Sequence, residues 1–376
     1  MSDIEPGPLV PSAAGHFDKW FHLPLPCASS DPRVEVRRAH PSEFERIYDL
    51  VDEVFGVRRP RVLYDWLYRR NPHGVARSWI VVERASGRLV SSLATYPWPL
   101  ARGPRALAAV QSGDAVVVPE WRGQVISRVR TEVRDSHPME QATIRFGWPN
   151  AGSRKALRKR GLEDRLLEPV PSYVLPMHAA DALTRHGWPR VLASAAARMA
   201  DTVVAAWTAI LLHRPFDGTV EPVRRFDATY DRATMGCVMW EGYWCPHTAD
   251  FLNWRYLDHL TRQYLAFAAV IAEAVAGYCV VRTDGERAWL MDFAAPPQPA
   301  SVACALLLRA ITAARDAGCG PLVVCAPPRW RHWPLVRSAG FVKVSLDISL
   351  YAWARDEPGV QRLENWQFLA GDMDGV

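Results

Sequence analysis

Lysine is nearly missing from this chain of 376 residues. The lysines are Lys19, Lys155, Lys159 and Lys343, and every other basic side chain that is charged at neutral pH is arginine. GC-rich genomes favour arginine in this way, so the arginines alone do not indicate a phosphate-binding surface. The chain has no run of five or six like charges, and its formal net charge is only +5. Neither nucleic acid nor an anionic membrane is therefore expected as a partner.

Paired cysteines and uninterrupted apolar segments are also lacking. The seven cysteines are scattered, without a Cys-x-x-Cys pair or a Cys/His ligand spacing, which predicts reduced thiols and no bound metal. The most apolar stretch, 193–212, is interrupted by Arg198 and Asp201, which favours a packed helix over a membrane span. The N-terminus has no basic segment followed by an apolar one, so we expect no signal peptide. These features predict a cytoplasmic protein that does not enter a membrane.

The composition is otherwise that of a globular protein. Hydrophobic residues make up 49% of the chain and charged residues 23%. The length suits two domains. Sixteen tryptophans are many for this length, and we interpret them mainly as core and loop-junction side chains.

The first half has the pattern of a layered α/β domain. Residues 1–32, rich in proline and serine, are predicted to be a flexible arm. From residue 33 the periodicity predicts the order β-α-α-β-β-β-α-β-α up to residue 161, with Ser42 and Glu45 forming a capping box at the first helix. Strands grouped before a strand–helix–strand unit predict a mixed sheet with helices on both faces, in a domain that covers 33–177.

The pattern then restarts after a helical connector predicted at 178–218. The aromatic segment Tyr64–Tyr68 has a counterpart in Leu252–Tyr256, where the shared feature is Trp-x-Tyr. The pair Gly161-Leu162 likewise has a counterpart in Gly340-Phe341. A repeat of nearly half the chain predicts two copies of one fold, the second covering 219–376.

One segment of the first half combines a strand, a glycine-containing loop and a helix. The strand ends at Val118-Pro119, the loop contains Arg122-Gly123, and the helix begins near Ile126. The first N–H groups of a helix lack intrahelical partners and carry partial positive charge, so this loop suits a pyrophosphate. It resembles the pyrophosphate-binding motif of the GNAT superfamily of N-acetyltransferases, [Arg/Gln]-x-x-Gly-x-[Gly/Ala], with Arg122 in the first position and Val125 in place of the motif glycine.

A second match lies downstream, where Phe146-Gly147-Trp148-Pro149-Asn150 is followed by a helix that ends at Gly161-Leu162. It is similar to the later GNAT motif, so the chain resembles a tandem two-domain GNAT protein. The resemblance implies acetyl-CoA, or another acyl-CoA, as co-substrate. Its implied cofactor-binding residues are Val116, Val117, Val118, Arg122, Gly123, Gln124, Val125, Ile126, Ser127, Asn150 and Ser153.

For catalysis, the resemblance implies direct attack of a neutral amine on the thioester carbonyl. Asp114 is the first candidate for the base, because it lies on the strand that leads to the loop; Tyr96, His73 and Glu83 are weaker candidates. Many family members carry a tyrosine as acid on the last helix, but Leu157 stands at that position. Ser153 is the candidate acid instead.

The second half lacks a phosphate loop, since Pro296, Pro297 and Pro299 remove backbone donors where phosphate would need them. Acyl-CoA is therefore assigned to the first domain, and the second would shape the acceptor pocket or complete the fold. The leading hypothesis is an acyl-CoA-dependent N-acyltransferase that acts on a small amine, such as an amino sugar or a biosynthetic intermediate. One alternative is a non-catalytic acyl-CoA sensor or scaffold, which Val125 and Leu157 favour. The other is an aminoacyl-transfer enzyme that builds peptide bridges, which would call for a larger basic surface.

Overall fold

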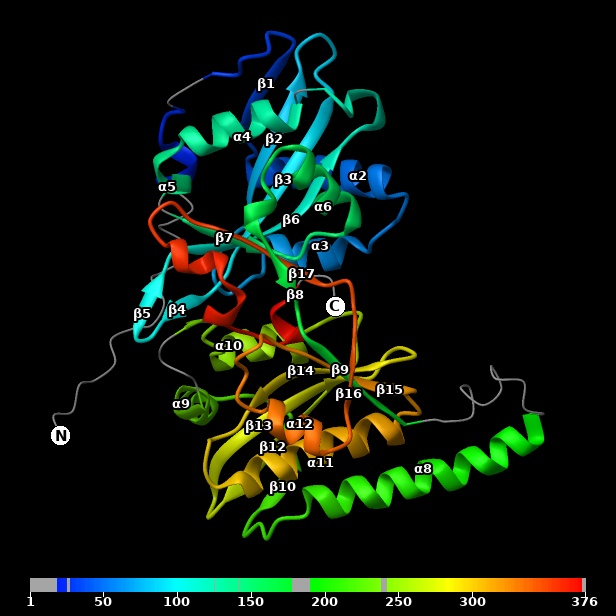
Figure 1. Cartoon of the computed structure of the whole chain (residues 1–376). Helices are drawn as coiled ribbons and strands as arrows, with labels where there is room; N and C mark the ends of the chain where they lie inside the picture. Colours follow the sequence, from blue (N-terminus) through cyan, green and yellow to red (C-terminus); the bar gives the residue numbers. More distant parts are fainter. Residues whose placement is uncertain are drawn as a thin grey trace, which may run out of the picture. The chain divides into compact units, whose positions relative to one another are not determined.

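The structure is a computed structural model that describes residues 19–25, 28–124, 126–141, 143–177, 190–237 and 242–373. The chain forms two compact units, each made of two segments. Unit 1 comprises Met1–Leu167 and Ser349–Arg362, and unit 2 comprises Glu168–Ile348 and Leu363–Val376. Each unit contains a seven-stranded sheet (Figure 1).

The sheet of unit 1 has the strand order β1-β2-β3-β6-β7-β17-β8. Strands β1, β2, β3 and β6 form an antiparallel meander, β6 and β7 are parallel, and β7 and β17 are antiparallel. The strands are β1 (Val34–Arg38), β2 (Arg77–Glu83), β3 (Leu89–Pro97), β6 (Ala109–Val117), β7 (Ile144–Gly147), β8 (Leu166–Pro169) and β17 (Ser349–Trp353), and β4 (Leu100–Arg102) and β5 (Arg105–Leu107) form a separate hairpin.

The helices of unit 1 are α2 (Phe44–Phe55), α3 (Arg61–Tyr68), α4 (Ile126–Ser136), α5 (Pro138–Gln141) and α6 (Ala151–Lys159). Two of these described helices, α2 and α4, pack on the sheet of this unit. Helix α4 contacts β1 and β2, while α2 contacts β3 and β6, and Figure 1 shows the two on opposite faces of the sheet. The predicted stripe of α4, Ile126, Val129 and Val133, is buried.

The predicted cap of the first helix is wrong in its residues. His40, not Ser42, caps a short 3-10 turn, η1 (Pro41–Glu43), and Glu43, not Glu45, completes the capping box. Helix α2 begins only after this turn and ends at Gly56, whose φ of 66° is the left-handed conformation that glycine adopts without strain.

Unit 2 repeats the same sheet, with the order β10-β12-β13-β14-β15-β9-β16. Strands β14 and β15 are the parallel pair, and the other neighbouring strands are antiparallel. The strands are β9 (Ser172–Pro176), β10 (Thr219–Pro222), β12 (Tyr264–Ile271), β13 (Ala274–Arg282), β14 (Ala288–Ala294), β15 (Pro321–Cys325) and β16 (Val342–Val344), and β11 (Tyr243–Trp244) pairs with β18 (Trp366–Gln367).

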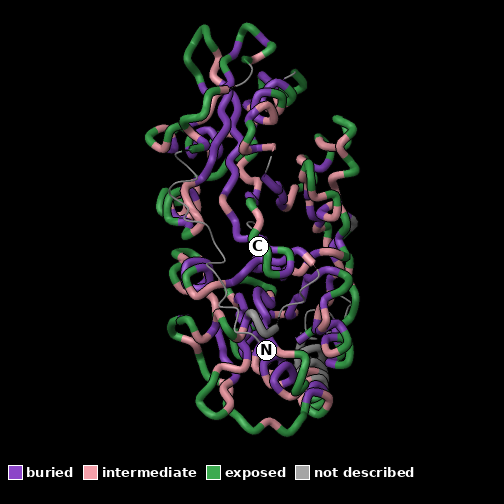
Figure 2. Tube along the Cα trace, turned by 90° about the vertical axis from the view of Figure 1, so that its left-hand side faces the viewer, coloured by how far each residue is buried: buried purple, intermediate pink, exposed green. Residues whose placement is uncertain are grey.

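The helices of unit 2 are α8 (Arg190–Leu212), α9 (Ala228–Cys237), α10 (Ala249–Leu252), the π-helical turn η4 (Asn253–Leu257), α11 (Ala300–Asp316) and α12 (Trp333–Ser338). The strands and α11 supply most of the buried apolar residues, and Figure 2 shows burial concentrated along the strands of each sheet. Helix α8 contacts α11, yet Met199, Val203 and Trp207 on α8 are exposed. None of the described helices is both long and apolar enough to cross a bilayer.

Relative to the domains predicted from the sequence, the two units exchange one strand each way. Strand β9 belongs to unit 2, and strand β17 belongs to unit 1. Strand β9 precedes the rest of unit 2 in sequence and inserts between β15 and β16. Strand β17, near the C-terminus, returns to unit 1 and inserts between β7 and β8. The compact units therefore do not end at the domain limits predicted from the sequence, 177 and 219. Of the predicted connector, 178–189 lies outside the described residues, and 190–212 is α8.

The fold class expected from the sequence is confirmed. Both units are mixed sheets with one parallel pair in matching positions, and helices pack against each of them.

Candidate functional site

The parallel strands of unit 1 separate soon after they pair. The pairing between β6 and β7 covers only Ala109–Gln111 and Ile144–Phe146. Strand β6 then continues to Val117 beside β3, while β7 stops at Gly147. At the point of separation, a Cβ on Gly147 would lie 2.8 Å from the carbonyl oxygen of Ser112, so only glycine allows this approach.

The loop that follows β6 is the segment predicted to bind a pyrophosphate. The turn η2 (Pro119–Trp121) leads to Arg122, Gly123 and Gln124, which are all exposed, and Gly123 has a φ of 77°. Arg122 Nε donates to the carbonyl oxygen of Val117 at 3.1 Å, which fixes the side chain beside the loop. Helix α4 begins at Ile126, so the N–H groups of its first turn point toward this loop.

The remaining residues assigned to acyl-CoA surround that turn in different ways. Val116, Val118 and Ile126 are buried in the core, whereas Val117 and Ser127 are half-buried. Val125 lies outside the described residues. The backbone of the segment, rather than its apolar side chains, is therefore the part available to a ligand.

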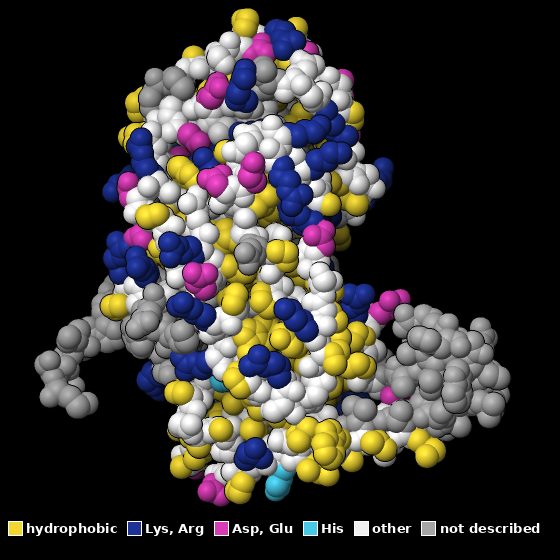
Figure 3. All heavy atoms as spheres, viewed as in Figure 1, with side chains coloured by type: hydrophobic (Ala, Val, Ile, Leu, Met, Phe, Trp, Pro, Cys, Tyr) yellow, Lys and Arg dark blue, Asp and Glu magenta, His cyan; other side chains and the backbone are white. Residues whose placement is uncertain are grey.

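Helix α6 adds positive charge to this unit. Lys155, Arg158, Lys159 and Arg160 are exposed on it or at its end, and the helix contains no acidic residue. Figure 3 shows Lys and Arg side chains gathered over the region where Figure 1 places α6. Arg160 Nη2 donates to Thr131 Oγ1 of α4 at 3.1 Å, so α6 and the phosphate-loop helix are neighbours.

The second motif forms the start of α6. Asn150 is its N-cap, and its side-chain oxygen accepts from the N–H of Ser153 at 2.9 Å. By accepting this hydrogen bond, Asn150 stabilises the N-terminus of α6. Ser153 is half-buried in the first turn of α6, and Leu157 lies one turn further along the same helix.

Asp114 lies in a distorted part of β6. Its φ is 44°, and the register between β3 and β6 shifts at this point, between Ser92 and Ala94. Its side chain is only 7% exposed and is bound by three donors. Arg59 Nη1 is 2.9 Å from Oδ1, and the hydroxyls of Tyr68 and Tyr96 donate to Oδ2 at 3.0 and 2.8 Å.

This arrangement bears on the role predicted for Asp114. Arg59, Tyr68 and Tyr96 already occupy both oxygens of this carboxylate. Burial and the neighbouring carboxylate hold the pKa of Tyr96 well above its ordinary value, so this phenol stays protonated. Of the weaker candidates, Glu83 accepts from the hydroxyl of Ser86, and the backbone N–H of His73 donates to Asn71 Oδ1 at 2.9 Å. A role of Asp114 as base stays a prediction.

Unit 2 has a matching cluster around Asp292 of β14. The register between β13 and β14 also shifts here, and Asp292 Oδ2 accepts from the hydroxyls of Tyr256 at 3.3 Å and Tyr278 at 3.5 Å. The cation is His247, whose Nδ1 lies 2.7 Å from Asp292 and whose Nε2 lies 2.8 Å from Asp372. Burial lowers the pKa of His247, but the two carboxylates outweigh it and raise that pKa to about 10.

Sequence reasoning missed Arg59, Tyr68, His247 and Asp372. A signal existed for the tyrosines, because Trp66-Leu67-Tyr68 and Trp254-Arg255-Tyr256 were recognised as a repeat, and each of these tyrosines donates to the aspartate of its own unit. No local pattern indicates His247 and Asp372, which are 125 residues apart in the chain.

Comparison with known proteins agrees with this geometry. Residues 35–163 match the model of the acetyltransferase (GNAT) domain family, which spans the splayed strands, the loop and α6 of unit 1. A search of curated proteins finds no significant match.

Several solved structures share the fold of almost the whole chain. A conserved Enterococcus faecalis protein of unknown function, described as a probable N-acyltransferase, has 13% identity and a TM-score of 0.59, covering 84% of this chain and 72% of that one. A GCN5-related N-acetyltransferase from Anabaena variabilis has 10% identity and a TM-score of 0.55, with 85% and 72% covered. The N-myristoyltransferase of Saccharomyces cerevisiae with bound myristoyl-CoA has 10% identity and a TM-score of 0.50, with 89% and 85% covered. Residues 35–163 are thus similar to the GNAT acetyltransferase domain, and the two-unit chain shares its fold with these solved structures.

Proposed function

We propose that unit 1 binds an acyl-CoA, most simply acetyl-CoA, and transfers the acyl group to the amine of a small molecule. The proposal depends on one observation. After β6 separates from β7, it leads to the exposed Arg122-Gly123-Gln124 loop, and α4 begins close behind that loop at Ile126. Free N–H groups, the helix dipole and Arg122 would bind the pyrophosphate. The pantetheine would then enter the gap between β6 and β7, near Asn150.

The chemistry follows from that placement. The neutral amine attacks the thioester carbonyl, the C–N bond forms, and the C–S bond breaks with release of the CoA thiolate. The amine loses one proton and the thiolate gains one. Backbone N–H groups at the bulge beside Asp114, where the ladder is interrupted, would stabilise the oxyanion. We assign Asp114 to holding this bulge, because its carboxylate is already bound by Arg59, Tyr68 and Tyr96.

Protonation of the thiolate is assigned to Ser153 or to solvent. Ser153 is half-buried at the start of α6, and Leu157 offers no hydroxyl on that helix. An ordinary hydroxyl is a weak acid, so Ser153→Ala is expected to lower turnover by less than tenfold if solvent supplies the proton. Steady-state rates with one amine acceptor distinguish the two sources.

Calorimetry of acetyl-CoA binding tests the proposal. Arg122→Ala removes a cation that would donate to phosphate, and losing one charge-assisted hydrogen bond costs about 1.5–3 kcal/mol, or roughly 10- to 150-fold in Kd. Arg46→Ala is the matched control, because Arg46 is an exposed arginine on α2 that pairs with Glu43. Absence of binding by the wild-type protein, or an equal loss in both variants, would refute the proposed site.

A second function is favoured by a specific observation. Because Asp114 is fully engaged and Leu157 replaces the expected phenol, unit 1 could bind acyl-CoA without transferring it, as a sensor or scaffold. Binding of acetyl-CoA combined with no acylation of any member of an amine panel would favour this function over transfer.

A further inference from the structure

Unit 2 contains a pocket at the place where its own parallel strands separate. Strands β14 and β15 pair only over Ala288-Trp289 and Leu322-Val323. Beyond that point, Phe293 and Ala294 of β14 and the segment Trp330–His332 after β15 line a cavity of about 80 Å³. This volume holds several water-sized groups.

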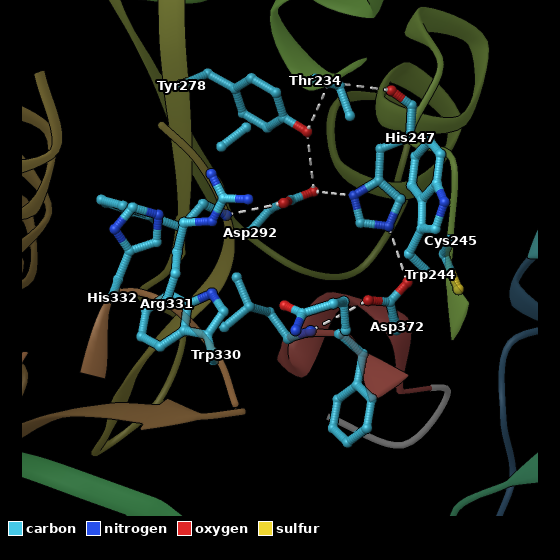
Figure 4. A pocket seen from close by; sticks show the side chains of 15 residues that line it. Thr234, Trp244, Cys245, His247, Tyr278, Asp292, Trp330, Arg331, His332 and Asp372 are labelled. Carbon is cyan, nitrogen blue, oxygen red and sulfur yellow. Dashed lines mark hydrogen bonds and ion pairs between the residues drawn. The ribbon is translucent and has the colours of Figure 1, made fainter. Parts of the chain in front are cut away.

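The pocket carries charge of both signs (Figure 4). Asp292 and Asp372 lie on either side of His247 at one part of the wall. Because the imidazole is protonated at neutral pH, this group of three side chains keeps one net negative charge. Burial lowers the pKa of His332 to about 4, so His332 is neutral there.

Arg331 supplies the opposite charge. It enters the pocket from the side of Trp330 and His332, across from His247 and Asp372 (Figure 4). Within the described part of the chain, its guanidinium makes no hydrogen bond or ion pair with another side chain. A half-buried guanidinium that makes no such bond among the described residues is suited to a carboxylate or phosphate, which it can bind through two parallel hydrogen bonds.

Aromatic side chains form another part of the pocket wall. They are Trp244, Phe293, Trp330 and Phe368. Aromatic faces attract an ammonium group and also cover the apolar body of a ligand. The walls thus combine one acidic region, one arginine and an apolar lining, which is the usual composition of a small-molecule site.

We propose that this pocket is a second ligand site, which binds a small zwitterion. Its ammonium group lies at Asp292 and Asp372, its acidic group at Arg331, and its apolar body against the aromatic side chains. The site belongs to unit 2 alone, which lacks a phosphate loop, so it is independent of acyl-CoA binding by unit 1.

The test is direct binding to the full chain in the absence of acyl-CoA, measured by calorimetry and by tryptophan fluorescence. The probes are ω-amino acids of increasing length, from glycine to 6-aminohexanoate, which vary the spacing between the two charges. Each is compared with the amine and the carboxylic acid of the same chain length. We expect one or two spacings to bind at least tenfold more tightly than either single-charge probe.

Variants locate the site. Arg331→Gln is expected to reduce zwitterion affinity at least tenfold, to that of the matched amine, and it changes a side chain that makes no hydrogen bond or ion pair among the described residues. Asp372→Asn should also weaken binding, although it touches the buried cluster. Asp114→Asn, the same change in the cluster of unit 1, is the matched control and should bind normally.

The outcomes are decisive for this site. Failure of every spacing to bind, binding of the acid alone with equal affinity, or unchanged affinity in Arg331→Gln would each overturn it. These results test the pocket separately from the acyl-CoA site. Arg122→Ala should weaken acetyl-CoA binding and leave zwitterion binding unchanged.

Discussion

The two units of this chain share one polar cluster and differ in the loop beside it. In each unit an aspartate lies three residues beyond the last parallel pair, Asp114 after Gln111 and Asp292 after Trp289. Each aspartate accepts from two tyrosines, one of them from a Trp-x-Tyr segment. Only unit 1 continues into an exposed glycine loop; unit 2 continues into prolines.

This difference separates the structural part of the site from the chemical part. The aspartate and its tyrosines occur in both units, which supports our proposal that they hold the distorted strand. The acyl-CoA site that we propose depends on the loop of unit 1. The cation differs as well: Arg59 is 38% exposed, whereas His247 is buried between two carboxylates.

Removing the aspartate should have the largest effect, and a larger one in unit 2. Asp292→Ala leaves the His247 cation and two phenols buried with fewer partners, which costs about 3–5 kcal/mol. Asp114→Ala should cost about 1–3 kcal/mol, because Arg59 can reach water and only the phenols lose a partner. Since the two units need not unfold together, hydrogen exchange read separately on β13–β14 and β3–β6 is the suitable measurement.

The control for this pair is Asp49→Ala, because Asp49 is an exposed aspartate on α2 with a surface ion pair. Its effect should stay below about 1 kcal/mol. Equal losses for Asp114→Ala and Asp292→Ala would show that the identity of the cation does not matter, and would remove the distinction between the units.

The pH dependence should also differ between the units. The pKa of His247 is about 10 when folded, against an ordinary value of 6.5. Its contribution is therefore fully present below about pH 6.5 and is lost as the pH rises toward 10. Arginine keeps its charge through this range, so the contribution of Arg59 should stay constant.

Two measurements check the sign. The stability lost in His247→Asn relative to wild type should be largest near pH 6 and vanish near pH 10, while the loss in Arg59→Gln should not vary. In NMR titrations the imidazole of His247 should remain protonated at pH 8, whereas burial makes His332 deprotonate near pH 4. A His247 imidazole that titrates near 6.5 would contradict the assigned cluster.

The sequence was sufficient for the fold, but not for the cluster. Periodicity located α4 and its stripe Ile126, Val129 and Val133, because a buried helix face leaves a local pattern. The exchange of β9 and β17 left no such pattern, since a strand has the same alternation in either sheet.

The partners of the aspartates could not be predicted from the sequence, because they lie far away in the chain. Asp114 was selected for its place on the strand, yet its binding to Arg59 depends on contacts across 55 residues. His247 reaches Asp372 across 125 residues. The Trp-x-Tyr repeat predicts that the fold is duplicated, but it does not predict that its tyrosine donates a hydrogen bond to an aspartate.

The smallest expected effect tests that repeat. Tyr68→Phe and Tyr256→Phe each remove one hydroxyl that donates to the aspartate and leave the ring in place, so each should cost about 0.5–1.5 kcal/mol. The cost should be somewhat larger for Tyr68, whose hydrogen bond is 3.0 Å long against 3.3 Å for Tyr256. Tyr173→Phe, on β9, serves as a control for loss of a hydroxyl from a half-buried ring.

Double-mutant cycles with the aspartates then decide what the repeat is for. Coupling of Tyr68 to Asp114 and of Tyr256 to Asp292 in stability alone would mean that both clusters hold a bulge, as we argue. If Tyr68→Phe lowered acyl transfer far more than it lowered stability, the phenol would take part in the chemistry of unit 1. The likeness of the two clusters would then be structural in origin, with a catalytic use in one unit only.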